Sequence, residues 1–260
     1  QYWLGTDKAL FAYDPIKGTY EQKITFECDK FNDMTSDANG NIYISVFSRG
    51  LCIYNSKTGA LKHYTSFDSK EGDDRLCNDW IMSMTTDHKG LVWMGTSSGI
   101  SCYDPKSDSF LSQGWNQQLN GMMCFSICEL RNGNIAIGTE QGLYLYDRQT
   151  AKVAPFPNSE ELSNKLINYI VQANDGDIWC STSMGIWQYE SDKKTFLGHI
   201  NGNGLTSKEY LYGVGMHNND DKIYFGNNDG LIVFNPSDVQ TTQSDSHELL
   251  LTSFFVGGTQ

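Results

Sequence analysis

The stretch Leu91–Pro105 reads LVWMGTSSGISCYDP, and close variants of it recur along the chain. Examples are YWLGTDKALFAYDP at Tyr2–Pro15, NIAIGTEQGLYLYD at Asn134–Asp147 and DIWCSTSMGIWQYE at Asp177–Glu190. Alignment on the W-x-G-T core gives six copies with anchors 40 to 50 residues apart, at Trp3, Tyr43, Trp93, Ala136, Trp179 and Tyr224. Repeats of about 40–45 residues built from short strands are typical of a β-propeller, with about four strands in each blade.

One unit of the repeat divides into four strands. Trp80–Thr86 is an apolar run that ends in the turn at 87–90, and Leu91–Thr96 and Ile100–Tyr103 flank a Ser-Ser-Gly hairpin. A short outer strand follows near Phe110. The turn residues tolerate or pre-set the backbone angles that tight turns need. The near-continuous apolar strands fit a sheet that is buried on both faces, with the aromatic anchor filling the gap to the next blade.

The sequence therefore predicts an all-β fold, a β-propeller of four-stranded antiparallel blades with six repeats visible. Residues 1–236 would form the blades. The first copy starts at its second strand, so we expect the six copies to be part of a seven-bladed ring. Residues 237–248 are polar and predict a linker, and 249–260 contain the apolar run LLLTSFFV. That run is expected to be either the first strand of a following β-sandwich domain or a strand that closes the ring.

Composition and charge narrow the class of partner. The formal net charge is −12, and the 15 Lys and four Arg are scattered along the chain. Nucleic-acid binding needs clustered cations, so we expect no nucleic acid to bind. A negative field repels polyanions, which favours neutral ligands. No apolar run approaches the roughly 20 residues that a membrane-spanning helix needs.

Motifs for chemistry are absent from the sequence. No nucleophile elbow, phosphate-binding loop, H-E-x-x-H or dinucleotide fingerprint occurs. The seven cysteines are odd in number and include no C-x-x-C pair, which argues against a full disulfide framework and against a zinc site. We therefore expect this chain not to be an enzyme and to need no cofactor or metal. A carboxylate pair that only folding brings together stays possible.

Positions that should be equivalent between repeats, yet differ in chemistry, suggest a binding site. The hairpins between second and third strands and the loops that enter the innermost strands should share one mouth of the central channel. Aromatic rings there could stack on sugars, while polar side chains bond hydroxyl groups. The stacking candidates are Trp80 and Trp115, and the polar candidates are Arg49, Asn78, Asp79, Glu209, Tyr210 and Asp229. The alternative is that these are ordinary loop residues, with Trp80 tucked between blades.

These residues resemble a known family, the two-component regulator propellers in the sensor region of Bacteroidetes hybrid histidine kinases. The unit Leu76–Phe110 follows that family's repeat, with Leu-x-Asn, D-x-x-G, W-x-G-T-x-x-G, Y-D-P and a closing Phe. The last copy resembles the family's final blade at Gly204-Leu205, Glu209-Tyr210, Tyr224-Phe225-Gly226, Gly230-Leu231 and Phe234-Asn235-Pro236. Scaffold departures are Ala136, Ser45, Ser181, Asn55 and Glu190.

The resemblance implies a periplasmic region that senses ligands for a downstream kinase. This chain would be most of the second of two propellers, followed by a tyrosine-rich β-sandwich and a membrane helix. The implied partners are oligosaccharides, expected to be neutral, the upstream propeller and the sandwich, with a homodimer possible. Two alternatives stay open: a propeller that binds proteins without a ligand of its own, and a polysaccharide lyase or hydrolase.

Overall fold

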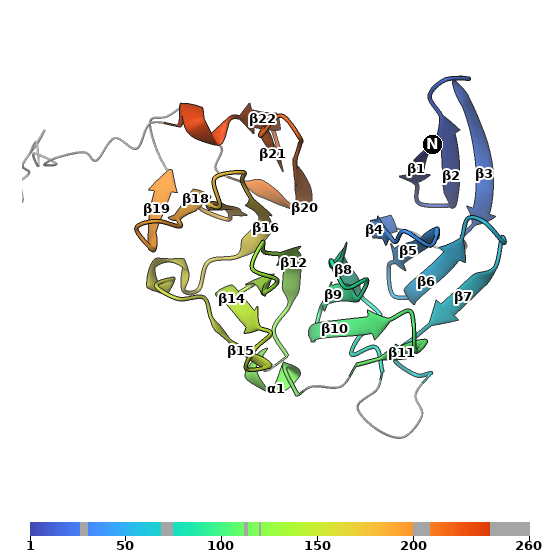
Figure 1. Ribbon diagram of the computed structural model, residues 1–260, viewed down its shortest axis with the longest axis horizontal. Coiled ribbons are helices and arrows are strands. Elements are labelled where there is room, and N and C mark those ends of the chain that lie inside the picture. The colour runs from blue at the N-terminus through green and yellow to red at the C-terminus, as the bar shows by residue number, and fades with distance from the viewer. Residues whose placement is uncertain (27–30, 69–74, 112–113, 120, 200–208, 240–260) are drawn as a thin grey trace, which may run out of the picture.

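The computed structural model describes residues 1–26, 31–68, 75–111, 114–119, 121–199 and 209–239, which fold into six antiparallel sheets in chain order (Figure 1). Each sheet is one blade. Blade 1 contains β1 (Tyr2–Gly5), β2 (Ala9–Asp14) and β3 (Thr19–Thr25). Blade 2 contains β4 (Phe31–Ser36), β5 (Asn41–Val46), β6 (Gly50–Asn55) and β7 (Leu61–Tyr64). Blade 3 contains β8 (Ile81–Thr86), β9 (Val92–Thr96), β10 (Gly99–Asp104) and β11 (Ser109–Phe110).

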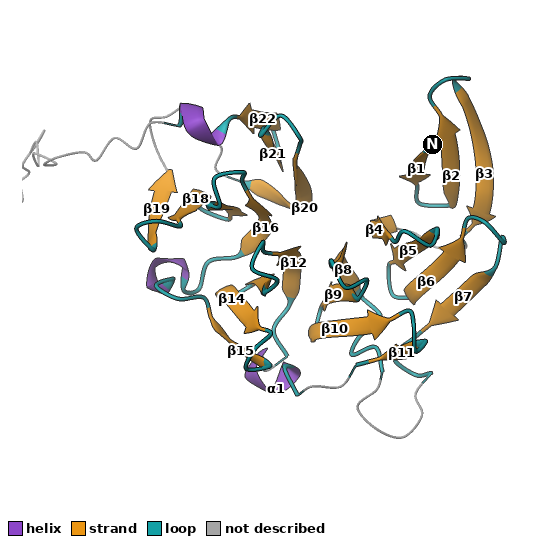
Figure 2. Ribbon diagram, in the orientation of Figure 1, coloured by secondary structure: helices purple, strands orange, loops and turns teal. Residues whose placement is uncertain are grey.

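Three more blades follow the same plan. Blade 4 contains β12 (Cys124–Glu129), β13 (Ile135–Thr139), β14 (Gly142–Asp147) and β15 (Lys152–Pro155). Blade 5 contains β16 (Ile167–Gln172), β17 (Ile178–Thr182), β18 (Gly185–Glu190) and β19 (Thr195–His199). Blade 6 contains β20 (Tyr210–His217), β21 (Ile223–Asn227) and β22 (Gly230–Phe234). The helices described are the short α1 (Asn116–Leu119), η1 (Glu160–Leu162) and η2 (Pro236–Asp238) (Figure 2).

The blades surround a central channel, which confirms the predicted all-β propeller. The innermost strands β4, β8, β12, β16 and β20 lie next to one another, and blades 1 and 6 stand at the two ends of an open arc (Figure 1). Blade 1 starts with the strand that carries Trp3, just as β9 carries Trp93, so β1 corresponds to the second strand of the other blades. A seventh blade is not among the described residues.

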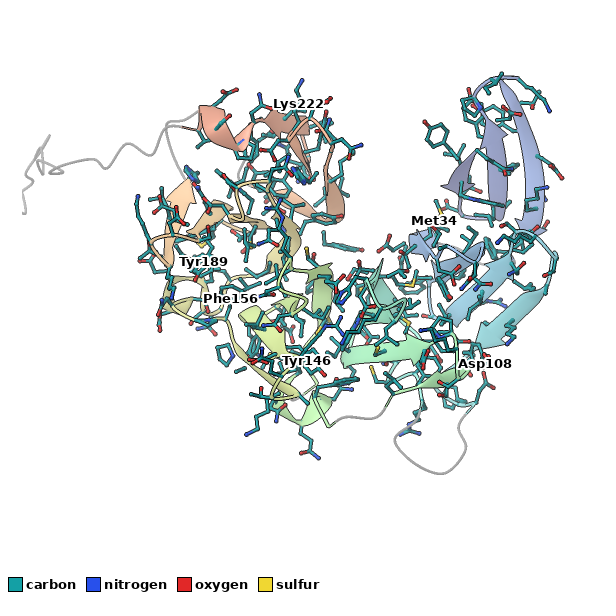
Figure 3. All side chains as sticks on the ribbon, viewed as in Figure 1. Met34, Asp108, Tyr146, Phe156, Tyr189 and Lys222 are labelled. Atoms are coloured by element: carbon teal, nitrogen blue, oxygen red, sulfur yellow. The ribbon has the colours of Figure 1, made fainter. Side chains whose placement is uncertain are left out.

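The aromatic anchors hold neighbouring blades together. Trp93 is fully buried in a cluster with Ile135 and Ile137 of the next blade, and Trp179 is buried against Phe225 in the same way. Burial of one such ring stabilises the fold by about 4–6 kcal/mol of gross free energy, at about 25 cal/mol per Å2 of apolar surface. In blade 4 the anchor is Ala136, and its cluster contains large rings from elsewhere, including Phe156 (labelled in Figure 3).

The two ends of the arc expose apolar sheet faces. On blade 6, Phe225 lies opposite Ile232 and is buried against blade 5, so the residues that alternate with Ile232 point away from blade 5. At the other end, β1 also carries exposed apolar side chains. The exposed residues, between 40% and 62% accessible, are Leu231 and Val233 on β22 and Tyr2 and Leu4 on β1. Such faces are buried at the junctions between the other blades.

The predicted linker and final strand fall mostly outside the described residues. η2 lies at the start of the predicted linker, and 240–260 are not described. Within the described part of the chain, no helix is both long enough and apolar enough to cross a membrane.

Candidate functional site

Two kinds of loop meet at one mouth of the channel, as the repeat pattern predicts. In blade 3, the backbone N–H of Ser97 in the β9–β10 hairpin donates to the carbonyl of Trp80, just before β8, at 2.9 Å. The equivalent bond in blade 4 joins Glu140 to Met123 at 3.1 Å. We call this mouth, with its second-to-third-strand hairpins and the starts of the innermost strands, the hairpin face. The opposite mouth, where the innermost strands end, is the turn face.

Four predicted site residues gather where blade 2 meets blade 3 on the hairpin face. The N–H of Gly50, next to the exposed Arg49, donates to the carbonyl of Asp79 at 3.0 Å. Asn78 accepts the backbone N–H of Trp80 at 2.8 Å. These bonds fix both the hairpin and the loop that enters β8. The structure therefore brings Arg49, Asn78, Asp79 and Trp80 into one group.

The ring of Trp80 has a neighbour that sequence reasoning did not single out. Phe47 lies 4.9 Å away, edge to face. Trp80 is half-buried, and its Nε1 has no hydrogen-bond partner among the described residues. The alternative interpretation of Trp80, as a residue tucked between blades, is thus partly right. The Nε1 atom itself is buried, so only the exposed part of the ring, and not the N–H group, could meet a sugar.

The predicted residues of blade 6 divide into surface and core. Glu209 is exposed and accepts the side-chain amide of Asn228 at 2.6 Å. Asp229 is exposed in the same hairpin. Tyr210 is buried, with its ring 6.2 Å from that of Phe225. Its ring therefore contributes to packing between blades 5 and 6 and offers no face to a ligand at the mouth.

Trp115 also needs a correction. It is only 3% exposed, and its ring lies 5.1 Å from Trp93 and 5.5 Å from Tyr146, which Figure 3 labels. The two neighbouring rings cover the faces that would stack on a sugar. Trp115 therefore packs the junction of blades 3 and 4. Its place just before α1 gave no hint of this in the repeat alignment.

A cavity in the channel lies beside the two surface groups. It measures about 260 Å3, and its walls come from the first residues of β4, β8 and β20. The lining residues are Phe31, Asn32, Met82, Leu211, Tyr212 and Gly213. Met82 follows Trp80 by two residues, and Leu211 follows Glu209 by two. The cavity, which we call the axial pit, therefore lies between the blade 2–3 group and the blade 6 group.

The channel has a different character toward the turn face. A cavity of about 410 Å3 there is lined by the last residues of β8, β12 and β16 together with Arg131 and His217. Its polar walls are already bonded: Gln172 accepts the N–H of Arg131 at 2.8 Å, and His217 pairs with Asp221 at 2.6 Å. Asp221 also accepts the backbone N–H of Asn174 at 3.0 Å, so these groups link blade 4 to blade 5 and blade 5 to blade 6.

The pKa of one carboxyl group between β4 and β8 is strongly raised. Burial raises the pKa of Asp33 to about 6, although its carboxylate accepts the backbone N–H groups of Met84 at 2.7 Å and Met34 at 2.8 Å. The carboxylate links β4 to β8 and has no adjacent nucleophile or second acid in the described part of the chain. Among described residues, no group of three or more His, Cys, Asp or Glu side chains could hold a metal ion.

The known proteins that this chain matches are solved structures. No family model matches the chain, and no curated protein matches it. The extracellular domain of BT4673 from B. thetaiotaomicron, assigned as a hybrid two-component system, aligns with a TM-score of 0.72 at 19% identity over 89% of this chain and 30% of that one. The extracellular domain of BT3049 from the same organism, also assigned as a hybrid two-component system, gives 0.70 at 19% identity over 90% and 32%.

One enzyme of known structure also resembles this chain in fold, with a lower TM-score. Virginiamycin B lyase from Staphylococcus aureus aligns with a TM-score of 0.54 at 14% identity, over 79% of this chain and 69% of the lyase. The present chain spans about a third of the length of the two Bacteroides sensor domains. It shares their propeller fold over nine-tenths of its own length, which matches the resemblance seen in the repeats.

Proposed function

We propose that this chain is a ligand-sensing propeller in the extracytoplasmic region of a hybrid two-component sensor histidine kinase. The observation that carries the proposal is the shared fold with the extracellular domains of two such systems over 89–90% of the chain. The repeat and final-blade motifs point to the same group of proteins. The compartment would be the periplasm, and the chain itself would catalyse no reaction.

The ligand is proposed to be a neutral oligosaccharide that regulates use of the parent polysaccharide. Trp80 with Phe47 offers an aromatic surface, and the exposed Arg49 on the neighbouring hairpin offers a donor. Asp79 is half-buried and accepts the backbone N–H of Ser66 through Oδ1 at 2.5 Å, which leaves Oδ2 as the candidate acceptor. Stacking combined with a few directed hydrogen bonds is how concave sites fix small polar ligands. The net charge of −12 disfavours polyanionic glycans.

Signalling would require that the ligand bind one arrangement of domains better than another, because only differential affinity shifts a population. The exposed faces of blades 1 and 6 support tight packing with a further blade, which would make a seven-bladed ring. The upstream propeller, the downstream β-sandwich and a second copy of the protein are the other proposed partners.

Calorimetry on the intact sensor region against a panel of neutral oligosaccharides tests the proposal. We expect binding that Trp80→Ala combined with Arg49→Ala weakens by at least tenfold. If no oligosaccharide of a broad panel binds, the oligosaccharide assignment is overturned.

A protein-interaction propeller is the second candidate, favoured by the apolar faces at both ends of the arc. Oligosaccharide affinity that is unchanged in the double variant would favour it, because the ligand would then bind elsewhere. Turnover of a glycan panel would instead favour a polysaccharide lyase or hydrolase.

A further inference from the structure

The innermost strand of blade 6 contains an insertion that the innermost strands of blades 2 to 5 lack. In β4, β8, β12 and β16 the pairing with the next strand slips by one residue, as between Cys124 and Ser126. In β20, Tyr210 pairs with Asn227 and the next pair is Gly215 with Phe225. Four residues, 211–214, therefore stand opposite one. Bulges of this kind redirect side chains and are frequent beside binding sites.

The bulge crosses the channel toward blades 3 and 4. Gly213 has φ +70°, a left-handed conformation that favours glycine, and a β-carbon there would lie 4.0 Å from the carbonyl oxygen of Met82. Tyr212 places its ring 5.6 Å from Phe125 of β12. Blade 6 thus reaches its opposite neighbours directly, and the bulge forms one wall of the axial pit.

The axial pit is apolar although it opens near a polar rim. Leu211 and Tyr212 are 42% and 38% exposed, and Phe31 and Met82 complete the apolar walls. The side-chain amide of Asn32 already donates to the carbonyl of Ile81 at 2.9 Å. Exposed apolar surface in a concave site is stabilised by an apolar group that removes it from water, at about 25 cal/mol per Å2.

The size of the pit limits its occupant. A dry cavity of about 150 Å3 lined by aliphatic and aromatic side chains is known to hold benzene, and the pit measures about 260 Å3. One aromatic ring or a short acyl chain fits, whereas an unsubstituted sugar would leave hydroxyl groups against Leu211 and Phe31 without partners. Unpaired hydroxyls in apolar surroundings cost about 1–3 kcal/mol each.

We propose that the axial pit binds an apolar substituent, an aryl or acyl group, carried by a saccharide whose ring rests on Trp80 and Arg49. This inference rests on the proposed function and adds the chemical class of the ligand: a substituted neutral saccharide. The pit lies close to the rim along the chain, because Met82 of the pit is in β8 and Trp80 immediately precedes that strand.

Paired glycosides test the inference in the intact sensor region. Calorimetry compares the methyl and phenyl β-glycosides of three neutral sugars. We expect at least one phenyl glycoside to bind about tenfold or more tightly than its methyl partner, a difference of about 1.4 kcal/mol. Leu211→Trp, which fills the pit, should abolish the difference. Met184→Trp, at an exposed position of the hairpin face in blade 5, is the matched control and should preserve it.

The outcomes separate this inference from the proposed function. Equal affinity for methyl and phenyl glycosides, with both weakened by Trp80→Ala and Arg49→Ala, overturns the pit and supports saccharide sensing. A phenyl preference that survives both Leu211→Trp and the smaller change Leu211→Ser also overturns the pit. Tight binding of phenyl glycosides that is independent of the sugar and of Trp80 supports the pit and overturns saccharide sensing.

Discussion

Blades 3 and 5 use the same aromatic position and satisfy it in different ways. In blade 3, Nε1 of Trp93 donates to Oδ2 of Asp87 at 2.8 Å, and Arg148 donates to the same carboxylate at 2.5 Å. Burial opposes ionisation of Asp87, but hydrogen bonds from Arg148, Trp93 and Leu91 outweigh it and lower the pKa of the carboxyl. The anchor of blade 3 is thus part of a charged network that spans two blades.

In blade 5 the turn residue equivalent to Asp87 is Ala173. Nε1 of Trp179 is buried without a hydrogen-bond partner among the described residues. Its ring instead stacks on His199, with centroids 5.2 Å apart, and His199 hydrogen-bonds Gln188 at 3.1 Å. The turn position therefore decides whether the indole N–H of the anchor has a carboxylate acceptor, whereas both anchors also contact aromatic rings. Both blades bury a large ring at this position, so burial of the ring is the stabilising contribution that the two junctions share. The polar partner of the ring differs between them.

The largest effect should come from removing the carboxylate of blade 3. Asp87→Ala leaves the buried indole N–H of Trp93 without its acceptor and removes one of the two carboxylates that pair with Arg148, since Glu129 stays 3.2 Å from the guanidinium. It should lower the free energy of unfolding by about 3 kcal/mol. Urea denaturation measures this. Asp37→Ala is the matched control, because Asp37 accepts comparable bonds, including one from Tyr43, but no guanidinium; its cost should be about 1–2 kcal/mol. Equal costs would show that Arg148 is irrelevant.

A smaller effect should separate the two indole N–H groups. Trp93→Phe and Trp179→Phe remove similar ring area, but only the first leaves an acceptor that has lost its donor. We expect Trp93→Phe to cost about 1 kcal/mol more than Trp179→Phe in urea denaturation. If Trp179→Phe is the more costly change, the stacked indole of blade 5 has a polar role that the present contacts do not explain.

The smallest effect concerns pH. Burial lowers the pKa of His199 below 6.5. The unfolded chain therefore binds a proton first as pH falls, so the contribution of His199 to stability is full above about 6.5 and is lost progressively below it. His199→Phe keeps an aromatic neighbour for Trp179 and should flatten this dependence in unfolding experiments between pH 7.5 and 6. Asp33, with its pKa raised to about 6, loses its proton across the lower part of this window and contributes to the pH slope with the opposite sign. Because wild type and variant share Asp33, its contribution cancels in their difference. An unchanged pH slope in the variant would contradict the assignment.

The repeat pattern predicted the fold because each unit places its aromatic anchor and its hairpin at fixed positions along the chain. The same reasoning put Arg49, Asp79 and Trp80 on one mouth, since equivalent loops of a propeller must lie on the same side. It failed for Trp115 and Tyr210, whose rings are covered by residues of neighbouring blades. Contacts between units are not contained in the alignment of the units.

Two features of the site were missed for related reasons. Phe47 lies in a hairpin whose equivalents carry no aromatic ring, so the column did not draw attention to it. The bulge of β20 adds residues to a strand, and an alignment anchored on Tyr224 simply absorbs extra residues as spacing. Insertions of this kind become visible as function only when the strand register is known.

The bulge of β20 also has a mechanical consequence. An open arc of blades could splay, because its ends are joined to nothing within the described residues, but the contact of Gly213 and Tyr212 with blades 3 and 4 acts as a brace across the diameter. A ligand bound in the axial pit would contact this bulge, and any displacement of the bulge would move blade 6. Binding in the axial pit would then shift the outer part of blade 6, which carries the exposed apolar side chains of Leu231 and Val233.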